Sequence, residues 1–180
     1  MFKLSLFKKL PSLEQASQVF AVIALVNYSW ATLRFFYRFP SWLFYSSVGE
    51  INVYFSYLIV VNLLESALLF ALYIVASLFL PPKWFHERFV SRSISLTILG
   101  LGYLIYVNYN FPSTDSYPLA SYTRVLTVAV LIVLLAFLVD RVAFIRNQLD
   151  GFANRAVVFL YVIIPVSAAA LLVVLFRNIF

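Results

Sequence analysis

Three polar residues within one apolar stretch have the types and the spacing of a functional site. Asn62, Glu65 and Ser66 stand at positions i, i+3 and i+4, so in a helix they share one face. A related carboxylate, that of aspartate, costs roughly 2.5 to 3.5 kcal/mol at the centre of a membrane-spanning helix. Glu65 should therefore be protonated, paired or next to a wet cavity, where it could serve an ion, a proton or a polar headgroup.

Partners for these residues are expected in the preceding apolar stretch. If two helices are antiparallel neighbours, depth can be counted from their shared connection at about 1.5 Å per residue. Asn27 then falls close to Glu65, and Arg34 lies somewhat nearer the connection. We predict an intramembrane polar cluster of Asn27, Arg34, Asn62, Glu65 and Ser66. Two interpretations remain open: the cluster binds a ligand, or it supplies hydrogen bonds that fix the packing of the helices.

The composition indicates which kind of element carries this cluster. Of the 180 residues, 64% are hydrophobic and 11% are charged, and the mean hydropathy is +0.97. Soluble domains have about 45–50% apolar and about 25% charged residues, so the sequence predicts a polytopic membrane protein. The chain has no cysteine and one histidine, which excludes disulfides, thiolate-bound metals and iron–sulfur clusters. We expect no metal site and no cofactor.

Apolar runs long enough to cross a bilayer core of about 30 Å occur five times. The predicted fold is an all-α transmembrane helical bundle, a single integral membrane domain over residues 1–180. Its spans are expected at about residues 17–37, 53–80, 90–110, 122–140 and 156–176. Ser12 and Gln15 have the spacing of a capping box before the first span. The prolines at 81 and 82 should end the second, and the Asp-Gly pair at 150–151 predicts a turn before the fifth, with Asn154 as its helix cap.

Lysine and arginine give the predicted orientation, because cytoplasmic connections are enriched in them. Nine fall on one side of the alternating spans: Lys3, Lys8, Lys9, Lys83, Arg88, Arg92, Arg141, Arg146 and Arg155. Four fall on the other: Arg34, Arg38, Arg124 and Arg177. The N-terminus is therefore predicted cytoplasmic and the C-terminus exoplasmic. These border residues account for the net charge of +6, so no nucleic-acid partner is expected.

Aromatic and basic residues predict contacts with the membrane surface. Residues 2–10 have the composition of an interfacial amphipathic anchor, and a surface segment is expected after Pro40. Lys83, Trp84 and Arg88 are expected to anchor the chain at the cytoplasmic headgroups, with specific binding of an anionic lipid as the alternative. Asp140 is interpreted as a border charge that pairs locally.

Two further features lie within the spans. Tyr103, Tyr106, Asn108 and Tyr109 form a candidate exoplasmic pocket at the end of the third span, with an aromatic belt as the alternative. Pro165 should kink the fifth span, because it removes a backbone hydrogen bond, and the kink could be a transport hinge or a static bend.

The number and orientation of the spans resemble, at the level of architecture, the five-span membrane modules of bacterial lipoteichoic-acid-synthase-like phosphoglycerol transferases and their sulfatase-fold relatives. The resemblance implies an exoplasmic catalytic domain after the fifth helix. The sequence to Phe180 contains no such domain, so no catalytic residue is carried over.

No catalytic motif of a hydrolase, nucleotide-binding protein or metalloprotease is present, and we expect no enzymatic activity. The expected function is that of a non-catalytic anchor or accessory subunit of a larger membrane assembly, in the bacterial cytoplasmic membrane. Its partners would be the lipid bilayer and other membrane protein subunits. One alternative is a small transporter or lipid-handling protein that uses the cluster around Glu65. The other is the membrane module of an exoplasmic transferase-like or sulfatase-like enzyme.

Overall fold

The computed structural model describes residues 10–82, 85–110 and 119–179, and side chains at 119–122 are left out. The described chain is helical and contains no strand; its elements are α2 (Leu13–Tyr45), α3 (Val48–Phe79), the short 3-10 turn η1 (His86–Arg88), α4 (Phe89–Asn110), α5 (Leu119–Arg141), α6 (Ala143–Ala156), η2 (Val157–Phe159) and α7 (Leu160–Ile179). In the part of the chain described, five helical segments are long and apolar enough to cross a membrane, with α6, η2 and α7 counted together. This is the number predicted, and it indicates an integral membrane protein.

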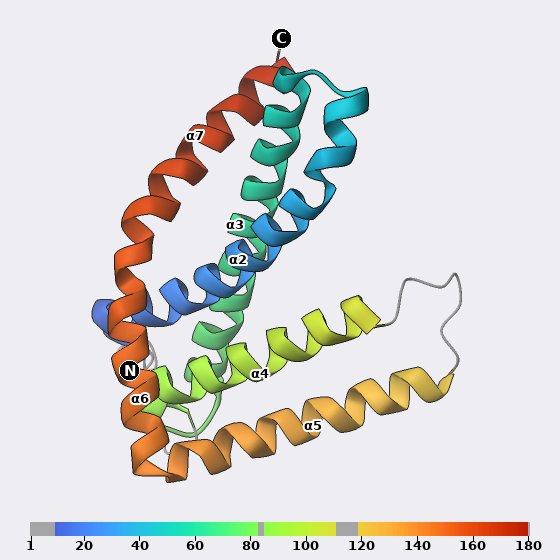
Figure 1. Ribbon diagram of the computed structural model, residues 1–180. Helices are drawn as coiled ribbons and strands as arrows, with labels where there is room; N and C mark the ends of the chain where they lie inside the picture. The colour runs from blue at the N-terminus through green and yellow to red at the C-terminus, as the bar shows by residue number, and fades with distance from the viewer. Residues whose placement is uncertain (1–9, 83–84, 111–118, 180) are drawn as a thin grey trace.

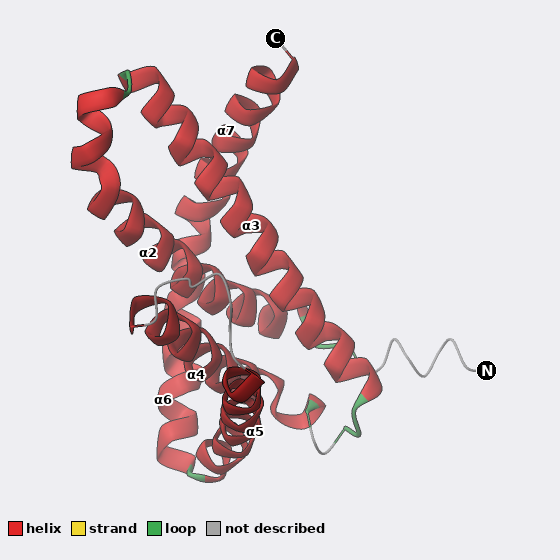
Figure 2. Cartoon of the chain, turned by 90° about the vertical axis from the view of Figure 1, so that its right-hand side faces the viewer, coloured by secondary structure: helices red, strands yellow, loops and turns green. Residues whose placement is uncertain are grey.

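The five long segments do not run parallel to one another. Figure 1 shows α2 and α3 joined as a hairpin, with α7 alongside α3, while α4 and α5 form a second hairpin that crosses α3 steeply; the first part of α2 packs along α4. The same steep crossing is visible from the side in Figure 2. The short helix α6 joins the end of α5 to the beginning of α7.

The first half of α2 is the centre of the fold. Val19, Val22 and Ile23 are at most 1% exposed, and this part of α2 packs against α3, α4 and α6. Small side chains allow a close approach to α6, where Ala153 and Ala156 are also buried. By contrast, α5 contacts mainly α4 and α6 and leaves most of its described side chains exposed.

Two helix ends agree with their local sequence signals. The capping box is confirmed. The backbone N–H of Gln15 donates to Ser12 Oγ at 3.2 Å, and the backbone N–H of Ser12 donates to Gln15 Oε1 at 3.1 Å. The second span ends at Phe79, just before the two prolines, as predicted. A second capping box, between Ser47 and Glu50, starts α3 and fixes the tight α2–α3 turn.

The first helix continues beyond its predicted end. Pro40 lies inside α2, which runs to Tyr45 instead of ending near Tyr37. Aromatic rings bridge the proline, because Phe35 packs against Trp42 at 5.3 Å between centroids, and Trp42 packs against Tyr54 of α3 at 5.6 Å. These contacts offset the backbone hydrogen bond that Pro40 removes.

The turn predicted at residues 150–151 is wrong. Both residues lie inside α6, and the chain instead leaves helical geometry at Val142, where φ is −84° and ψ is 104°. One glycine costs a helix only about 1 kcal/mol, and the packing of α6 on α2 outweighs it. Asn154 is therefore no cap; its Oδ1 accepts a hydrogen bond of 2.6 Å from Gln18 Nε2, which ties α6 to α2.

Candidate functional site

The predicted polar cluster forms only in part. Asn27 Nδ2 of α2 donates to Ser66 Oγ of α3 at 3.1 Å. Asn62 is buried on the same side of α3, but its Nδ2 donates to the Leu58 carbonyl of its own helix at 2.8 Å. At this level, the polar contact between α2 and α3 is thus the interhelical hydrogen bond between Asn27 and Ser66. The neighbouring Asn62 side chain bonds to its own helix.

Glu65 does not join this contact, which corrects the expected cluster. Its side chain is exposed, whereas Ser66 is 0% exposed. Successive helical residues are rotated by about 100°, so Glu65 lies about 100° around α3 from Ser66 and about 60° from Asn62. Because α2 packs against the side that carries Asn62 and Ser66, that rotation turns Glu65 away from the interface.

The outward face of α3 surrounds Glu65 with apolar side chains. Val61 is 48% exposed, Leu64 58%, Leu68 71% and Leu72 60%. These residues follow one another at intervals of three or four, the spacing of a continuous helical stripe. We call these four residues together with Glu65 the α3 outer face. A carboxyl group near the middle of a 32-residue helix therefore lies within an apolar surface that nothing in the described chain covers.

Arg34 is the second residue that leaves the predicted cluster. Its Nη1 donates to Asn108 Oδ1 of α4 at 2.8 Å, and its guanidinium lies 5.8 Å from the ring centroid of Trp30. Together with Arg38 and Tyr109, these residues line a pocket of about 280 Å³ between α2 and α4. The cation thus belongs with the residues at the end of α4 and not with Glu65.

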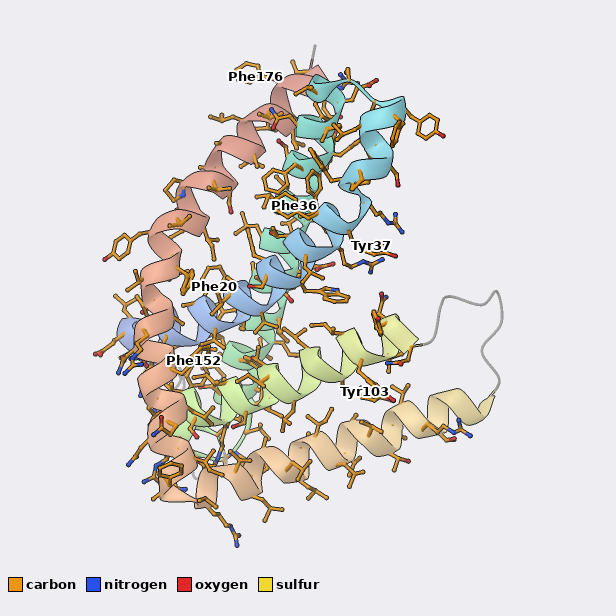
Figure 3. All side chains as sticks on the ribbon, viewed as in Figure 1. Phe20, Phe36, Tyr37, Tyr103, Phe152 and Phe176 are labelled. Carbon is orange, nitrogen blue, oxygen red and sulfur yellow. The ribbon has the colours of Figure 1, made fainter. Side chains whose placement is uncertain are left out.

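The four residues of the candidate exoplasmic pocket are only partly brought together. Asn108 and Tyr109 line the pocket beside Arg34, while Tyr106 is 57% exposed. Tyr103 is half-buried one helical turn before Tyr106. In Figure 3, Tyr37 of α2 lies on the side facing α4, whereas Phe36 lies on the side facing α7.

Where α4 begins and α5 ends, a buried carboxylate forms the densest polar arrangement among the described residues. Asp140 is 0% exposed. Its Oδ2 accepts from Arg92 Nε at 2.9 Å, Arg92 Nη2 at 2.8 Å and Arg88 Nη1 at 3.1 Å, and Ser91 Oγ donates to its Oδ1 at 3.1 Å. Arg88 Nη1 also donates to the Asp140 carbonyl at 3.0 Å. The expected local pairing of Asp140 is wrong, because its partners are Arg88, Ser91 and Arg92, 48 to 52 residues earlier in the chain; its interpretation as a border charge stays a prediction.

The sequence carries a signal for this arrangement that the interpretation missed. Arg92 follows Arg88 by four residues, the spacing of one helical face, and the two lie where η1 passes into α4. Asp140 closes an apolar run that is antiparallel to α4, at the same end of the hairpin. Depth was counted from a shared connection to place Asn27 level with Glu65. The same count from the connection between the third and fourth spans would have placed Asp140 level with Arg92.

A pocket opens beside this ion cluster between α4 and α5. Its volume is about 660 Å³, and its lining combines charged with apolar side chains: Glu87, Arg88, Arg92, Val133, Leu134, Phe137 and Arg141. The Arg92 guanidinium lies over the Phe137 ring, 4.8 Å from its centroid. The pocket therefore has a cationic end and an apolar wall.

Pro165 lies next to a hydrogen-bonded contact of three helices. The helix α7 continues through the proline. Two residues later, Ser167 Oγ lies 2.7 Å from the Tyr28 hydroxyl of α2, which is also 3.3 Å from the Ile59 carbonyl of α3. Tyr28 and Ser167 are both buried, so the part of α7 next to Pro165 is packed against α2 and α3.

Of the predicted headgroup anchors, Lys83 and Trp84 lie outside the described residues, as do residues 1–9. Arg88 is described, and it binds Asp140 while 40% of its side chain remains exposed. Among the described residues, no group of three or more His, Asp or Glu side chains is placed to hold a metal ion. No family model, curated protein or solved structure matches the chain.

Proposed function

We propose that this chain is a non-catalytic subunit of a larger membrane assembly, which it joins through the α3 outer face. The observation that carries the proposal is the position of Glu65. It is an exposed acid near the centre of a membrane-length helix, and its neighbours on the same face are apolar.

A lone chain would leave the Glu65 carboxyl group facing lipid tails. The related carboxylate of aspartate costs roughly 2.5 to 3.5 kcal/mol in that position, and polar residues within spans are usually paired or in contact with water. A partner helix that carries a lysine, arginine or amide side chain at the same depth would satisfy Glu65. The apolar residues on either side along α3 would supply the packing contact.

The proposal includes the orientation given by the basic residues. Arg88, Arg92 and Arg141 line one pocket, and Arg146 lines a neighbouring pocket that shares Arg88. These arginines are thus collected at one end of the helices, and the positive-inside rule assigns that end to the cytoplasm. The same rule places the N-terminus in the cytoplasm; we further propose a bacterial cytoplasmic membrane as the location.

The alternatives have less support. A transporter centred on Glu65 would need the carboxyl group to face an internal polar cluster, but Asn27 and Ser66 bond to each other without it. The enzyme-module alternative rests on the number and orientation of spans alone.

Site-directed crosslinking in native membranes tests the partner proposal. The chain has no cysteine, so the residue introduced by Leu64→Cys or by Leu68→Cys would be the only thiol in the chain. With a thiol-directed photocrosslinker, we expect both to join the chain to the same membrane protein, and peptide mapping should place the joined residue in a spanning helix of that protein. Leu131→Cys, on the 50% exposed lipid-facing part of α5, is the matched control.

Three results would contradict the proposal. They are crosslinking from Leu131→Cys to the same protein with equal yield, no crosslink from either α3 position, and a crosslinked product with the mass of two copies of this chain. Adding Glu65→Leu to the Leu68→Cys variant should lower the yield of the specific product severalfold, whereas Glu14→Gln, at the start of α2, should not.

A further inference from the structure

The pocket between α4 and α5 has a charge that its own acids do not balance. Arg88, Arg92 and Arg141 line it, and they are opposed by Glu87 in the lining and by Asp140 behind it. One positive charge is therefore in excess among these five side chains. Arg141 is exposed, so its guanidinium is accessible to a ligand.

Two of the three guanidinium groups at this site, those of Arg88 and Arg92, are held in place by Asp140 before any ligand arrives. Arg92 makes two contacts with Asp140 Oδ2, at 2.8 and 2.9 Å, and Arg88 makes one at 3.1 Å. The Phe137 ring supports Arg92 from one side. Arginine side chains lose rotational freedom when they bind an anion, and fixing them in advance lowers that cost.

The apolar wall of the pocket continues from the charges along α5. Phe137 lies four residues before Arg141, and Leu134 and Val133 follow at seven and eight residues, so all four share one face of the helix. At about 1.5 Å per residue, the wall extends about 12 Å from the arginine end toward the middle of α5. Leu134 is 54% exposed and Val133 is 44% exposed, so an apolar chain can lie against them.

We propose that this pocket binds an anionic phospholipid, with its phosphate at Arg88 and Arg141 and an acyl chain along Phe137 and Leu134. Guanidinium groups bind phosphate oxygens with charge-assisted hydrogen bonds, which accounts for the cationic end. A free phosphate could form the same hydrogen bonds, but it has no apolar part to contact Val133, Leu134 and Phe137. The apolar wall therefore favours a lipid as the source of the phosphate. None of the residues that line this pocket belongs to the α3 outer face. The lipid proposal can therefore be tested independently of the proposed protein partner.

Lipid retention by the full chain tests this proposal. The protein is placed in nanodiscs that contain equal amounts of phosphatidylcholine and phosphatidylglycerol, extracted in mild detergent, and its bound lipids are measured by native mass spectrometry. We expect the wild-type chain to retain phosphatidylglycerol preferentially. Arg141→Gln should reduce that preference about tenfold, the effect of one lost charge-assisted hydrogen bond. Leu134→Trp, which fills the apolar wall, should reduce it as well.

Matched variants distinguish a specific site from general charge. Arg177→Gln removes the same charge at the far end of α7, and Leu126→Trp adds the same ring to a part of α5 outside the pocket, where Leu126 is 68% exposed. Both should retain the wild-type preference. Arg141 and Leu134 are exposed, so all four variants should fold, and unchanged thermal unfolding midpoints verify this.

The proposal is overturned if the wild-type chain shows no preference for phosphatidylglycerol or if Arg177→Gln lowers the preference as much as Arg141→Gln. A third arm adds millimolar inorganic phosphate to the detergent wash. If phosphate displaces the bound phosphatidylglycerol, the ligand is a free anion and the lipid assignment is wrong.

Discussion

Arg92 of α4 and Asp140 of α5 form a buried ion pair at 2.8 Å, although 48 residues separate them in the chain. Among the described side chains of α5, only Ala136 and Asp140 are buried. The ion pair is therefore a principal contact that holds the α4–α5 hairpin together at its open end, where α4 begins and α5 ends. It also places Arg88 beside the same carboxylate.

Asp140→Asn should lower the free energy of unfolding by about 3 to 5 kcal/mol. The substitution keeps the size of the side chain but leaves Arg92, 11% exposed, as an uncompensated buried charge. Denaturant unfolding of the detergent-solubilised chain measures the loss, and Arg141→Gln, a charge change on the exposed neighbour, serves as control. A loss below about 1 kcal/mol would mean that the pair is open to water.

The two arginines should contribute unequally to stability. The side chain of Arg92 is 11% exposed and that of Arg88 is 40% exposed, so water screens the Arg88 pair far more strongly. We expect Arg92→Gln to cost about 3 kcal/mol and Arg88→Gln less than about 1 kcal/mol. Unfolding of the two single variants under identical conditions decides this. Equal costs would show that Asp140 depends on both partners together.

The number of membrane-length helices and several of their ends could be predicted from the sequence, because those signals are local. Apolar run length sets a span, and two prolines stop α3 wherever the helix packs. The extension of α2 through Pro40 was not predictable in the same way. It depends on Trp42 meeting Tyr54, a residue of the next helix, and no local pattern contains that contact.

The polar contacts were harder to predict because they depend on how each helix is rotated. The spacing of Asn62, Glu65 and Ser66 placed all three on one broad face, but only the packing of α2 selects which part of that face is buried. The packing of α4 along α2 likewise brings Asn108 to Arg34, a contact that neither helix's own sequence pattern contains. Rotation and crossing angle are tertiary properties.

A double-mutant cycle should detect the bond between Asn27 and Ser66. Interhelical hydrogen bonds in membrane proteins contribute about 0.6 kcal/mol on average, so we expect a coupling energy of about that size between Asn27→Ala and Ser66→Ala. Unfolding free energies of the wild type, both single variants and the double variant give the value. Combining Asn27→Ala with Ser77→Ala, at another buried serine of α3, should give no coupling.

Tyr28→Phe should destabilise the contact of α2 with α3 and α7. The substitution removes the hydroxyl that lies 2.7 Å from Ser167 Oγ and keeps the ring, so the expected cost is about 1 kcal/mol. Tyr161→Phe on α7 makes the same chemical change at a side chain that is 79% exposed and should cost almost nothing. Thermal unfolding compares the two. Identical midpoints would show that the Tyr28 hydroxyl contributes no more to stability than an exposed one.

Glu65→Leu should leave the free energy of unfolding of the isolated chain unchanged within about 0.5 kcal/mol. The Glu65 side chain is exposed, so its replacement removes no internal packing contact. Asn62→Leu, one turn away but 8% exposed and bonded at 2.8 Å to the Leu58 carbonyl, should be clearly destabilising in the same assay. Unfolding in detergent measures both. A loss above about 1 kcal/mol for Glu65→Leu would mean that the carboxyl group supports the fold itself. An unchanged stability together with a lower crosslinking yield from Leu68→Cys would separate the role of Glu65 in assembly from any role in folding.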